Sequence, residues 1–455
     1  MRFALRFALF PARGLPATRL ALAAPLLALL YLPAAHGADD LLQVYRDAQA
    51  NDAQFASARA QLAASQEKLP QGRAGLLPQI AGAVGASRTK VDQSAPVVGD
   101  RFLNGNNWAL QLTQPLFRWD RWETYKQGEL AALAGEVSFS QAQLDLITRT
   151  SQAYFDVLAS QDNLYLAGAQ KKAIAEQLAQ AKRNFEVGTA TITDTHEAQA
   201  RFDLAAAQEI AAQNDLDAKK RALQQLTGKE YVTLRPLRAD VKLAPPEPNR
   251  MDDWVGLAEK QSYPVQIQEL ASEIAQLEVR RNAAGHHPTL DLVASYGWTS
   301  QTSSQLTAVG SNVGTGTLGL QFGLPLYAGG AISSREREAA ANFEKSRQDL
   351  ENARRSAALA TRQSYLAVIN GIAQVGALEQ ALVSSQSALD SNKLGYEVGV
   401  RINIDVLNAQ QQLFSTRRDL ALARYNTITN HLRLKSAAGS LREEDVELVS
   451  RALVP

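Results

Sequence analysis

FEVGTATITD, at positions 185–194, returns as YEVGVRINID at positions 396–405, 211 residues further along the chain. In each copy an aromatic residue opens the motif, a Val-Gly pair follows and an Asp closes it. Helices readily end on glycine, because it accepts the left-handed conformation at the C-terminal cap. Polar pairs such as Thr193/Asp194 and Asn403/Asp405 favour the start of a new helix as N-caps. Each copy is therefore expected to form the tip of a helical hairpin.

Other landmarks recur at nearly the same spacing as the tips. GLLP at 75–78 corresponds to GHHP at 285–288, and QPLF at 114–117 corresponds to LPLY at 324–327. A nearly constant offset between several landmarks indicates an internal duplication. We expect two structural repeats, at 38–228 and 252–439, with an inter-repeat linker at 229–251 and a C-terminal tail at 440–455.

The first 37 residues have the features of a secretory signal peptide. Four arginines accompany the apolar run at 20–32, and AHG at 35–37 is a small-x-small cleavage pattern. Their removal changes the net charge from +1 to −3, which does not favour nucleic acid as a partner. The rest of the chain has no uninterrupted run of about 18 apolar residues, so we expect no membrane-spanning helix.

The composition also excludes several kinds of chemistry. The chain has no cysteine, so disulfides, thiol catalysis and a lipid anchor on an N-terminal cysteine are excluded. The sequence shows no nucleotide-binding loop, no nucleophile–base pair and no zinc-ligand spacing. We therefore predict no enzymatic activity, no cofactor and no metal site.

Proline placement predicts very long helices. No proline occurs between Pro115 and Pro236, or between Pro325 and Pro455, and a proline inside a helix costs about 3 kcal/mol. The expected long helices are 120–187 and 331–398, each roughly 100 Å long at 1.5 Å per residue. The expected shorter helices, about half as long, are 41–75, 193–226, 252–284 with a kink at Pro264, and 404–437.

Two pairs of strands separate these helices. Residues 290–298 and 318–324 alternate between apolar and small or polar side chains, and 80–86 and 108–112 repeat the pattern more weakly. This period of two is typical of strands with one apolar face. Polar segments at 91–106 and 300–316 are expected to be loops. Trp119 and Trp122, just past a strand end, are typical of a membrane-interface belt.

Four strands cannot by themselves cross a membrane, because lipid does not tolerate the unpaired edges of an open sheet. Small barrels take about eight strands, and water-filled ones take more. Two chains would supply eight strands and three would supply twelve. The expected object is a barrel shared between chains, with its lumen continued by an open cylinder of coiled-coil helices.

The motifs LPQI at 77–80, HPTLDL at 287–292, QLTQPLF at 111–117 and the two tips resemble the TolC family of outer-membrane efflux proteins. The resemblance covers essentially the whole mature chain. It implies an α+β membrane protein: a homotrimer with a twelve-stranded outer-membrane barrel and a twelve-helix periplasmic tunnel. It also implies a periplasmic adaptor (membrane fusion) protein and an inner-membrane transporter of the RND, MFS or ABC type as partners. The implied function is drug efflux, type I secretion or both, at the outer membrane of a Gram-negative bacterium.

The resemblance also assigns roles at the tips. It implies that a periplasmic gate is closed by Asp194, which accepts a hydrogen bond from Tyr396 and an ionic contact from Arg401, with Thr193 as a further partner. The residues allow a plainer interpretation, in which Asp194 is an N-cap with Glu197 as its capping-box partner. In that interpretation, Tyr396 is a packing aromatic residue and Arg401 a solvated charge.

The resemblance implies a pore constriction at Asp405 and Asn408. Close relatives carry a second Asp where this chain has Asn408, so we expect weaker inhibition by trivalent cations. Taken alone, Asp405 is also a plausible helix cap. The implied adaptor-docking tips are Val187, Gly188, Thr189, Val398, Gly399 and Val400, which also serve as ordinary C-caps.

The alternative to a channel is a soluble periplasmic coiled-coil scaffold without a barrel. The apolar strand faces, repeated at the same offset in both halves, favour the channel.

Overall fold

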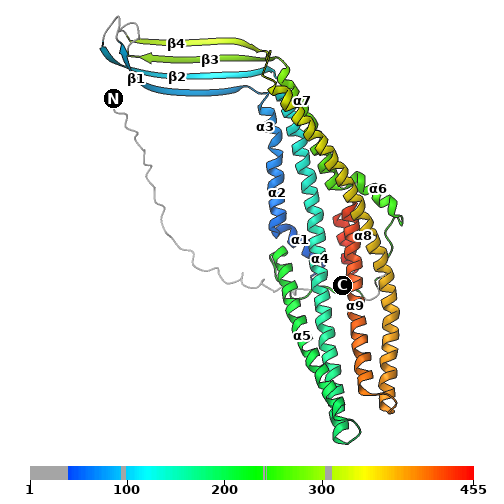
Figure 1. The fold of residues 1–455 in the computed structure, drawn as a ribbon. Helices are drawn as coiled ribbons and strands as arrows, with labels where there is room; N and C mark the ends of the chain where they lie inside the picture. The colour runs from blue at the N-terminus through cyan, green and yellow to red at the C-terminus, as the bar shows by residue number, and fades with distance from the viewer. Residues whose placement is uncertain (1–38, 94–98, 239–240, 242, 303–309, 455) are drawn as a thin grey trace, which may run out of the picture. The chain divides into compact units, whose positions relative to one another are not determined.

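The computed structural model describes residues 39–93, 99–238, 241, 243–302 and 310–454. The expected signal peptide at 1–37 lies outside these residues. Figure 1 shows long helices leading from a four-stranded sheet to two hairpin tips. The elements of the first half are α1 Leu41–Asn51, α2 Ala53–Gln66, α3 Lys68–Ala74, β1 Gln79–Gln93, β2 Gly99–Phe117, α4 Trp119–Glu186 and α5 Ile192–Thr227. Those of the second half are α6 Met251–Gln261, α7 Tyr263–Ala283, the 3-10 turn η1 Ala284–His286, β3 Thr289–Gln301, β4 Ser311–Gly323, α8 Ala331–Glu397, α9 Asn403–Ala437 and α10 Glu443–Arg451.

The two long helices are continuous, as the proline-free runs predicted. Helix α4 has 68 residues and α8 has 67. Shorter helices pack along each of them. Helix α3 lies against the first part of α4, where a Cβ on Gly128 would meet the carbonyl oxygen of Lys68 at 2.5 Å. Helix α5 lies against the last part, where Lys171 and Glu209 form an ion pair of 2.8 Å. Two shorter segments thus pack along one long helix.

The shorter helices before each sheet segment are broken, which corrects the expectation of one helix at 41–75 and a kinked one at 252–284. Asp52 has an extended backbone (φ −66°, ψ 118°) and its carboxylate accepts the Gln54 and Phe55 amides, so a new helix starts there. Ser262, 210 residues later, has the same conformation (φ −66°, ψ 134°). Pro264 lies in the first turn of α7, where backbone N–H groups have no partner within the helix, so the proline costs no helix hydrogen bond.

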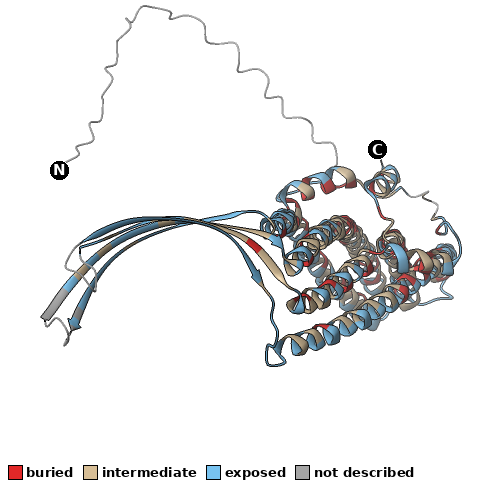
Figure 2. Cartoon of the chain, turned by 90° about the horizontal axis from the view of Figure 1, so that it is seen from above, coloured by how far each residue is buried: buried red, intermediate tan, exposed pale blue. Residues whose placement is uncertain are grey.

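The four strands form an antiparallel sheet in the order β1-β2-β3-β4. The registers Val84↔Trp108, Trp108↔Trp298 and Ala294↔Leu318 place the apolar side chains of all four strands on one face. Val84 is 89% exposed and Leu318 is 75% exposed, so nothing in the described part of the chain covers these side chains. Figure 2 shows the strands mostly in the colour of exposed residues. Trp119 and Trp122, where α4 begins, are also exposed.

The strands are longer than the sequence pattern predicted. Much of the two expected loops, 91–106 and 300–316, is paired strand, including Arg88↔Asn104 and Ser300↔Asn312. Their polar and glycine residues were mistaken for loop residues, because side-chain polarity does not prevent the backbone ladder from continuing. Residues 94–98 and 303–309 lie outside the described part of the chain.

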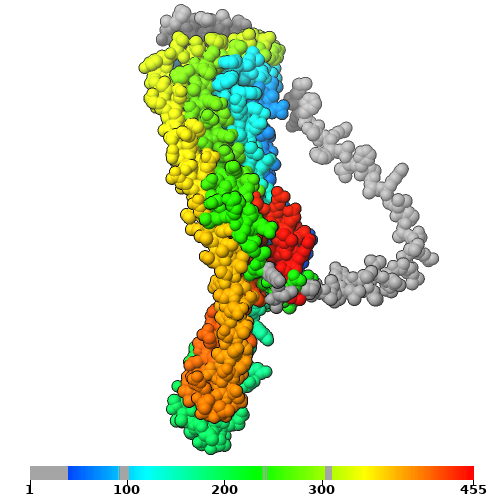
Figure 3. Space-filling view, turned by 90° about the vertical axis from the view of Figure 1, so that its right-hand side faces the viewer, coloured from blue at the N-terminus to red at the C-terminus, as the bar shows by residue number. Residues whose placement is uncertain are grey.

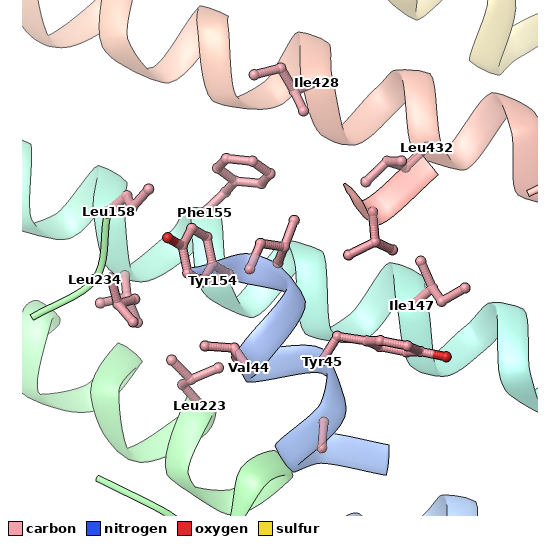
Figure 4. Close-up of a cluster of buried hydrophobic side chains, with 14 of the residues drawn as sticks. Val44, Tyr45, Ile147, Tyr154, Phe155, Leu158, Leu223, Leu234, Ile428 and Leu432 are labelled. Atoms are coloured by element: carbon pink, nitrogen blue, oxygen red, sulfur yellow. The ribbon is translucent and has the colours of Figure 1, made fainter. Parts of the chain in front are cut away.

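The largest buried cluster lies where α1, α4, α5, α9 and α10 meet (Figure 4). Tyr154 and Phe155 of α4 are fully buried there, with their rings edge to face at 5.6 Å. The Tyr154 hydroxyl donates to the Arg235 carbonyl at 2.8 Å. Arg235 belongs to the linker at 229–251, so this hydrogen bond ties the linker to the core.

The linker and the tail contact each other beside this core. A bridge joins Leu237 to Leu453, and a second joins Asp39 to Leu234. Lys435 of α9 pairs with Asp445 of α10 at 2.6 Å. The polar pair Tyr425–Asp162 lies nearby, with the hydroxyl donating to the carboxylate at 2.6 Å. Burial raises the pKa of Asp162, and the hydrogen bond from Tyr425 opposes that shift.

By length and composition alone, one helix in the described part of the chain, α8, is long and apolar enough to cross a membrane. The expectation of no membrane-spanning helix considered only uninterrupted apolar runs, whereas the apolar part of α8 also contains polar residues. Its large apolar side chains are mostly buried or partly buried, since Val368 and Val375 are buried and Ile369, Ile372, Leu378 and Leu382 pack against buried clusters.

Candidate functional site at the helical tips

The two tips share the same C-terminal cap. Gly188 and Gly399 adopt left-handed conformations, with φ of +80° and +78°. The amide of Gly188 donates to the Phe185 carbonyl at 3.0 Å, and that of Gly399 donates to the Tyr396 carbonyl at 3.1 Å. The next amides reach back to the carbonyls of Asn184 (2.8 Å) and Gly395 (2.9 Å). This is the Schellman pattern, in which glycine satisfies carbonyls that the helix end leaves free.

The first tip starts its second helix with a capping box. The N-cap of α5 is Thr191, whose hydroxyl oxygen accepts the Asp194 amide at 3.3 Å. The Asp194 carboxylate in turn accepts the Thr191 amide (2.9 Å) and hydroxyl (2.8 Å). The expected N-cap role of Thr193 or Asp194, with Glu197 as partner, is therefore wrong, because the N-cap lies two residues before Thr193 and three before Asp194. Thr193 itself is exposed.

The second tip has no such box. The N-cap of α9 is Ile402, which makes no side-chain cap, so the expectation that Asn403 or Asp405 caps this helix is also wrong. The Asp405 carboxylate instead forms an ion pair with Arg401 at 3.7 Å, and the two side chains are 34% and 60% exposed. An exposed pair of this kind contributes about 0–1 kcal/mol.

Near the tips, side-chain hydrogen bonds at two places join the hairpins, and the sequence pattern predicted neither. Asn184 donates from its amide to the Tyr396 hydroxyl at 3.1 Å, which links the end of α4 to the end of α8. Arg201 of α5 donates to Asn408 at 3.0 Å and to Gln411 at 2.6 Å, both on α9. Long-range contacts of this kind leave no local pattern.

The predicted gate residues therefore lie at one end of the helices, but they have other partners within a single chain. Tyr396 contacts Asn184, Arg401 contacts Asp405, and Asp194 contacts Thr191. The gate assignment remains a prediction.

The predicted docking residues are at the extreme ends of the hairpins. Val187, Val398 and Val400 are exposed by 72%, 64% and 76%. Figure 3 shows both tips, in green and orange, at one end of the visible face. Exposed valines at a hairpin end are compatible with a partner surface. No group of three or more potential metal ligands occurs among the residues that the structure describes.

Comparison with known proteins places the chain in a class. The sequence model of the outer membrane efflux protein family matches residues 44–229 and 254–440. Outer membrane protein TolC of Escherichia coli is 36% identical over 425 residues, which span 91% of this chain and 85% of the relative. The proteases secretion protein PrtF of Dickeya chrysanthemi is 34% identical over 419 residues, 89% of each chain.

A solved structure shows the same fold. The outer membrane protein VceC of Vibrio cholerae superposes with a TM-score of 0.75 at 19% identity, covering 88% of this chain and 96% of VceC. The fold and the tips thus define an outer-membrane channel protein built from long helical hairpins and a sheet. The chain belongs to the outer membrane efflux protein family.

These findings confirm the predicted α+β membrane fold and the resemblance to the TolC family. The chain is an outer-membrane channel for efflux or type I secretion, with a large periplasmic helical part, and it is not an enzyme. Nothing supports the alternative of a soluble periplasmic scaffold.

Proposed function

We propose that three copies of this chain close into one twelve-stranded barrel. The observation that carries this proposal is the sheet itself: β1 and β4 each pair on one side only, and the apolar face is uncovered. Open edges are not tolerated in lipid, so the edge strands β1 and β4 must pair with those of neighbouring copies. The uncovered face then meets lipid, and the polar face lines the lumen.

The helices continue the barrel as a tunnel. Each chain supplies four helical columns: α4, α8, the stack of α1–α3 on α5, and the stack of α6–α7 on α9. Three chains therefore supply twelve. Exposed apolar side chains on α8, such as Leu366 and Val383, support this closure, because apolar surface in water favours contact with another protein surface. We assign the membrane-spanning role to the strands.

The repeats and the linking segments keep the boundaries expected from the sequence. In this proposal, 1–37 is removed as a signal peptide. Residues 38–228 and 252–439 form the two repeats, while 229–251 and 440–455 form a belt beside the helical core. The bridge between Leu237 and Leu453 supports the pairing of the two belt segments.

The periplasmic gate lies between the tips of neighbouring copies. In the closed ring, Asp194 and Thr193 of one copy face Tyr396 and Arg401, and Asp405 with Asn408 lines the narrowest point. The weak ion pair between Arg401 and Asp405 supports an easily opened latch, since neither side chain is buried.

The partners are a periplasmic adaptor and an inner-membrane transporter of the RND, MFS or ABC type. The adaptor docks on the exposed tip residues 187–189 and 398–400. Docking opens the gate by replacing the weak contacts among the tips. The names of the relatives support both kinds of cargo, since PrtF is a protease secretion protein and the family is named for efflux.

The test uses the mature protein purified in detergent. We expect a mass of three chains and ion-conducting channels in planar bilayers. Replacing Arg401 by Ser should raise the single-channel conductance without changing the helical content. The matched control is Arg355→Ser, which removes an exposed ion pair with Glu351 far from the tips. A monomer without channel activity would contradict the proposed function. Equal conductance of both variants and the unaltered protein would contradict the latch.

A further inference from the structure

Arg201 connects two hairpins through neutral acceptors. It lies on α5, seven residues after Asp194, and its guanidinium crosses to α9. One terminal nitrogen donates to Gln411 at 2.6 Å, and the other donates to Asn408 at 3.0 Å. Both acceptors are amide oxygens, so these bonds orient the guanidinium without neutralising its charge. A positive charge is thus held in place on the α9 surface.

This charge lies beside the Asp405 carboxylate. Asn408 follows Asp405 by three residues, so both side chains lie on one face of α9, separated by about 4.5 Å of axial rise. Arg401 forms an ion pair with Asp405 at 3.7 Å. One helical turn is shorter than the screening length of about 8 Å at physiological ionic strength, so the charge held at Asn408 acts on the Asp405 carboxylate.

Other carboxylates on α5 leave Arg201 unpaired. Glu197 lies one turn before Arg201 on the same face, yet no ion pair joins the two among the described residues. Asp194 lies almost two turns away and is held by the capping box with Thr191. Arg201 therefore forms no ion pair among the described residues, and its charge is held one turn from Asp405.

We propose that Arg201 determines the ionic preference of the channel entrance, by placing a ring of positive charges one turn from the Asp405 ring. This inference rests on the proposed function, because the tips of three copies must line one entrance. Rings of charged side chains set the selectivity of pores. With Arg201 present, its charge offsets that of Asp405, so the entrance discriminates weakly between cations and anions and holds multivalent cations poorly.

The test is the permeability ratio of K⁺ to Cl⁻ in planar bilayers under a salt gradient. Arg201→Gln removes the charge but keeps an amide of similar reach, and it should raise this ratio by roughly threefold. Block by hexaamminecobalt(III), added at the periplasmic side, should strengthen. The matched control is Arg201→Lys, which keeps the charge and should leave both readouts near those of the unaltered protein.

Asp405→Asn tests the position of the entrance independently of Arg201, so it distinguishes a failure of this inference from a failure of the proposed function. This variant should lower the permeability ratio. If Asp405→Asn lowers it while Arg201→Gln leaves it unchanged, the entrance is correctly placed and the role of Arg201 is refuted. If neither substitution changes the ratio, both the entrance and this inference are refuted. A trimer mass and an unchanged helical spectrum show that the variants fold.

Discussion

Around α1, α4, α9 and α10 the chain buries its aromatic and aliphatic side chains almost completely, whereas at the two tips it exposes them. Tyr154 and Phe155 are at most 1% exposed in the first region, while the three tip valines are mostly exposed. Local stability follows buried apolar contact, so the tips belong to the part of the chain that opens most readily. The difference places the least buried part of the hairpins away from the core that holds the chain together.

The two tips differ from each other in a similar way. Both end their first helix on a left-handed glycine, but only the first starts its second helix with a side-chain cap. The duplication preserved the Asp at 194 and 405 while Thr191 became Ile402 in the second copy. Asp194 is consequently engaged in its own helix start, whereas Asp405 is available to Arg401. The same residue type therefore has two roles, determined by the neighbour three positions earlier.

The largest expected effect tests the contrast between core and tips. Phe155→Ala should lower the free energy of unfolding by about 3–5 kcal/mol, because it leaves a cavity among fully buried neighbours. The matched tip substitution, Val398→Ala, should change it by less than about 0.5 kcal/mol, since that side chain is largely exposed. Thermal unfolding of both variants, followed by circular dichroism in detergent, measures the difference. Similar losses of unfolding free energy in the two variants would contradict the difference between the buried core and the exposed tips.

A smaller effect tests the left-handed glycine that ends the first helix of both tips. Gly399→Ala should destabilise the protein by about 1–2 kcal/mol, because φ is +78° and a side chain strains that conformation. Gly256→Ala is the matched control: nothing lies within 4 Å of its added Cβ either, but it lies inside α6 without a positive φ. That control should stabilise by about 0.4–1 kcal/mol. If both substitutions changed the free energy of unfolding in the same direction, the left-handed conformation of Gly399 would not explain the effect at the tip.

The smallest effect tests the side-chain N-cap, which the first tip has and the second lacks. Thr191→Ala should cost about 1 kcal/mol of local stability by removing the N-cap. Amide hydrogen exchange in the first turn of α5 should then accelerate about fivefold. Ile402→Thr should have the opposite effect at the start of α9, by giving Asp405 a capping partner.

The control for this pair is Thr193→Ala, which alters an exposed threonine outside the capping box. Its exchange rates should match those of the unaltered protein. Acceleration by Thr193→Ala as large as that by Thr191→Ala would contradict the assignment of the cap.

Much of the fold followed from local patterns in the sequence, and the errors have identifiable causes. The proline-free runs predicted α4 and α8 to within a residue or so, because helix propagation is a local property. The helix breaks at Asp52 and Ser262 were missed, although Asp52 is a typical N-cap. The strands were predicted too short at the ends that face the loops, because pairing depends on the partner strand and not on side-chain polarity alone.

The site was predicted less completely than the fold. The tip motifs placed the candidate residues correctly at the hairpin ends, but not their partners. Contacts from Asn184 to Tyr396 and from Arg201 to Asn408 depend on how α4, α5, α8 and α9 are rotated against one another. That rotation is set by the packing of whole helices, for which no short motif is diagnostic.

By itself, the sequence determined the duplication, the long helices, the alternating strands and the two glycine tips, because each depends on residues close together in the chain. Only the tertiary structure decided that Arg201 contacts Asn408 and that Asn184 contacts Tyr396. The physical reason is that charge and hydrogen bonding act over a few ångströms in space, between side chains that the sequence separates by some two hundred residues.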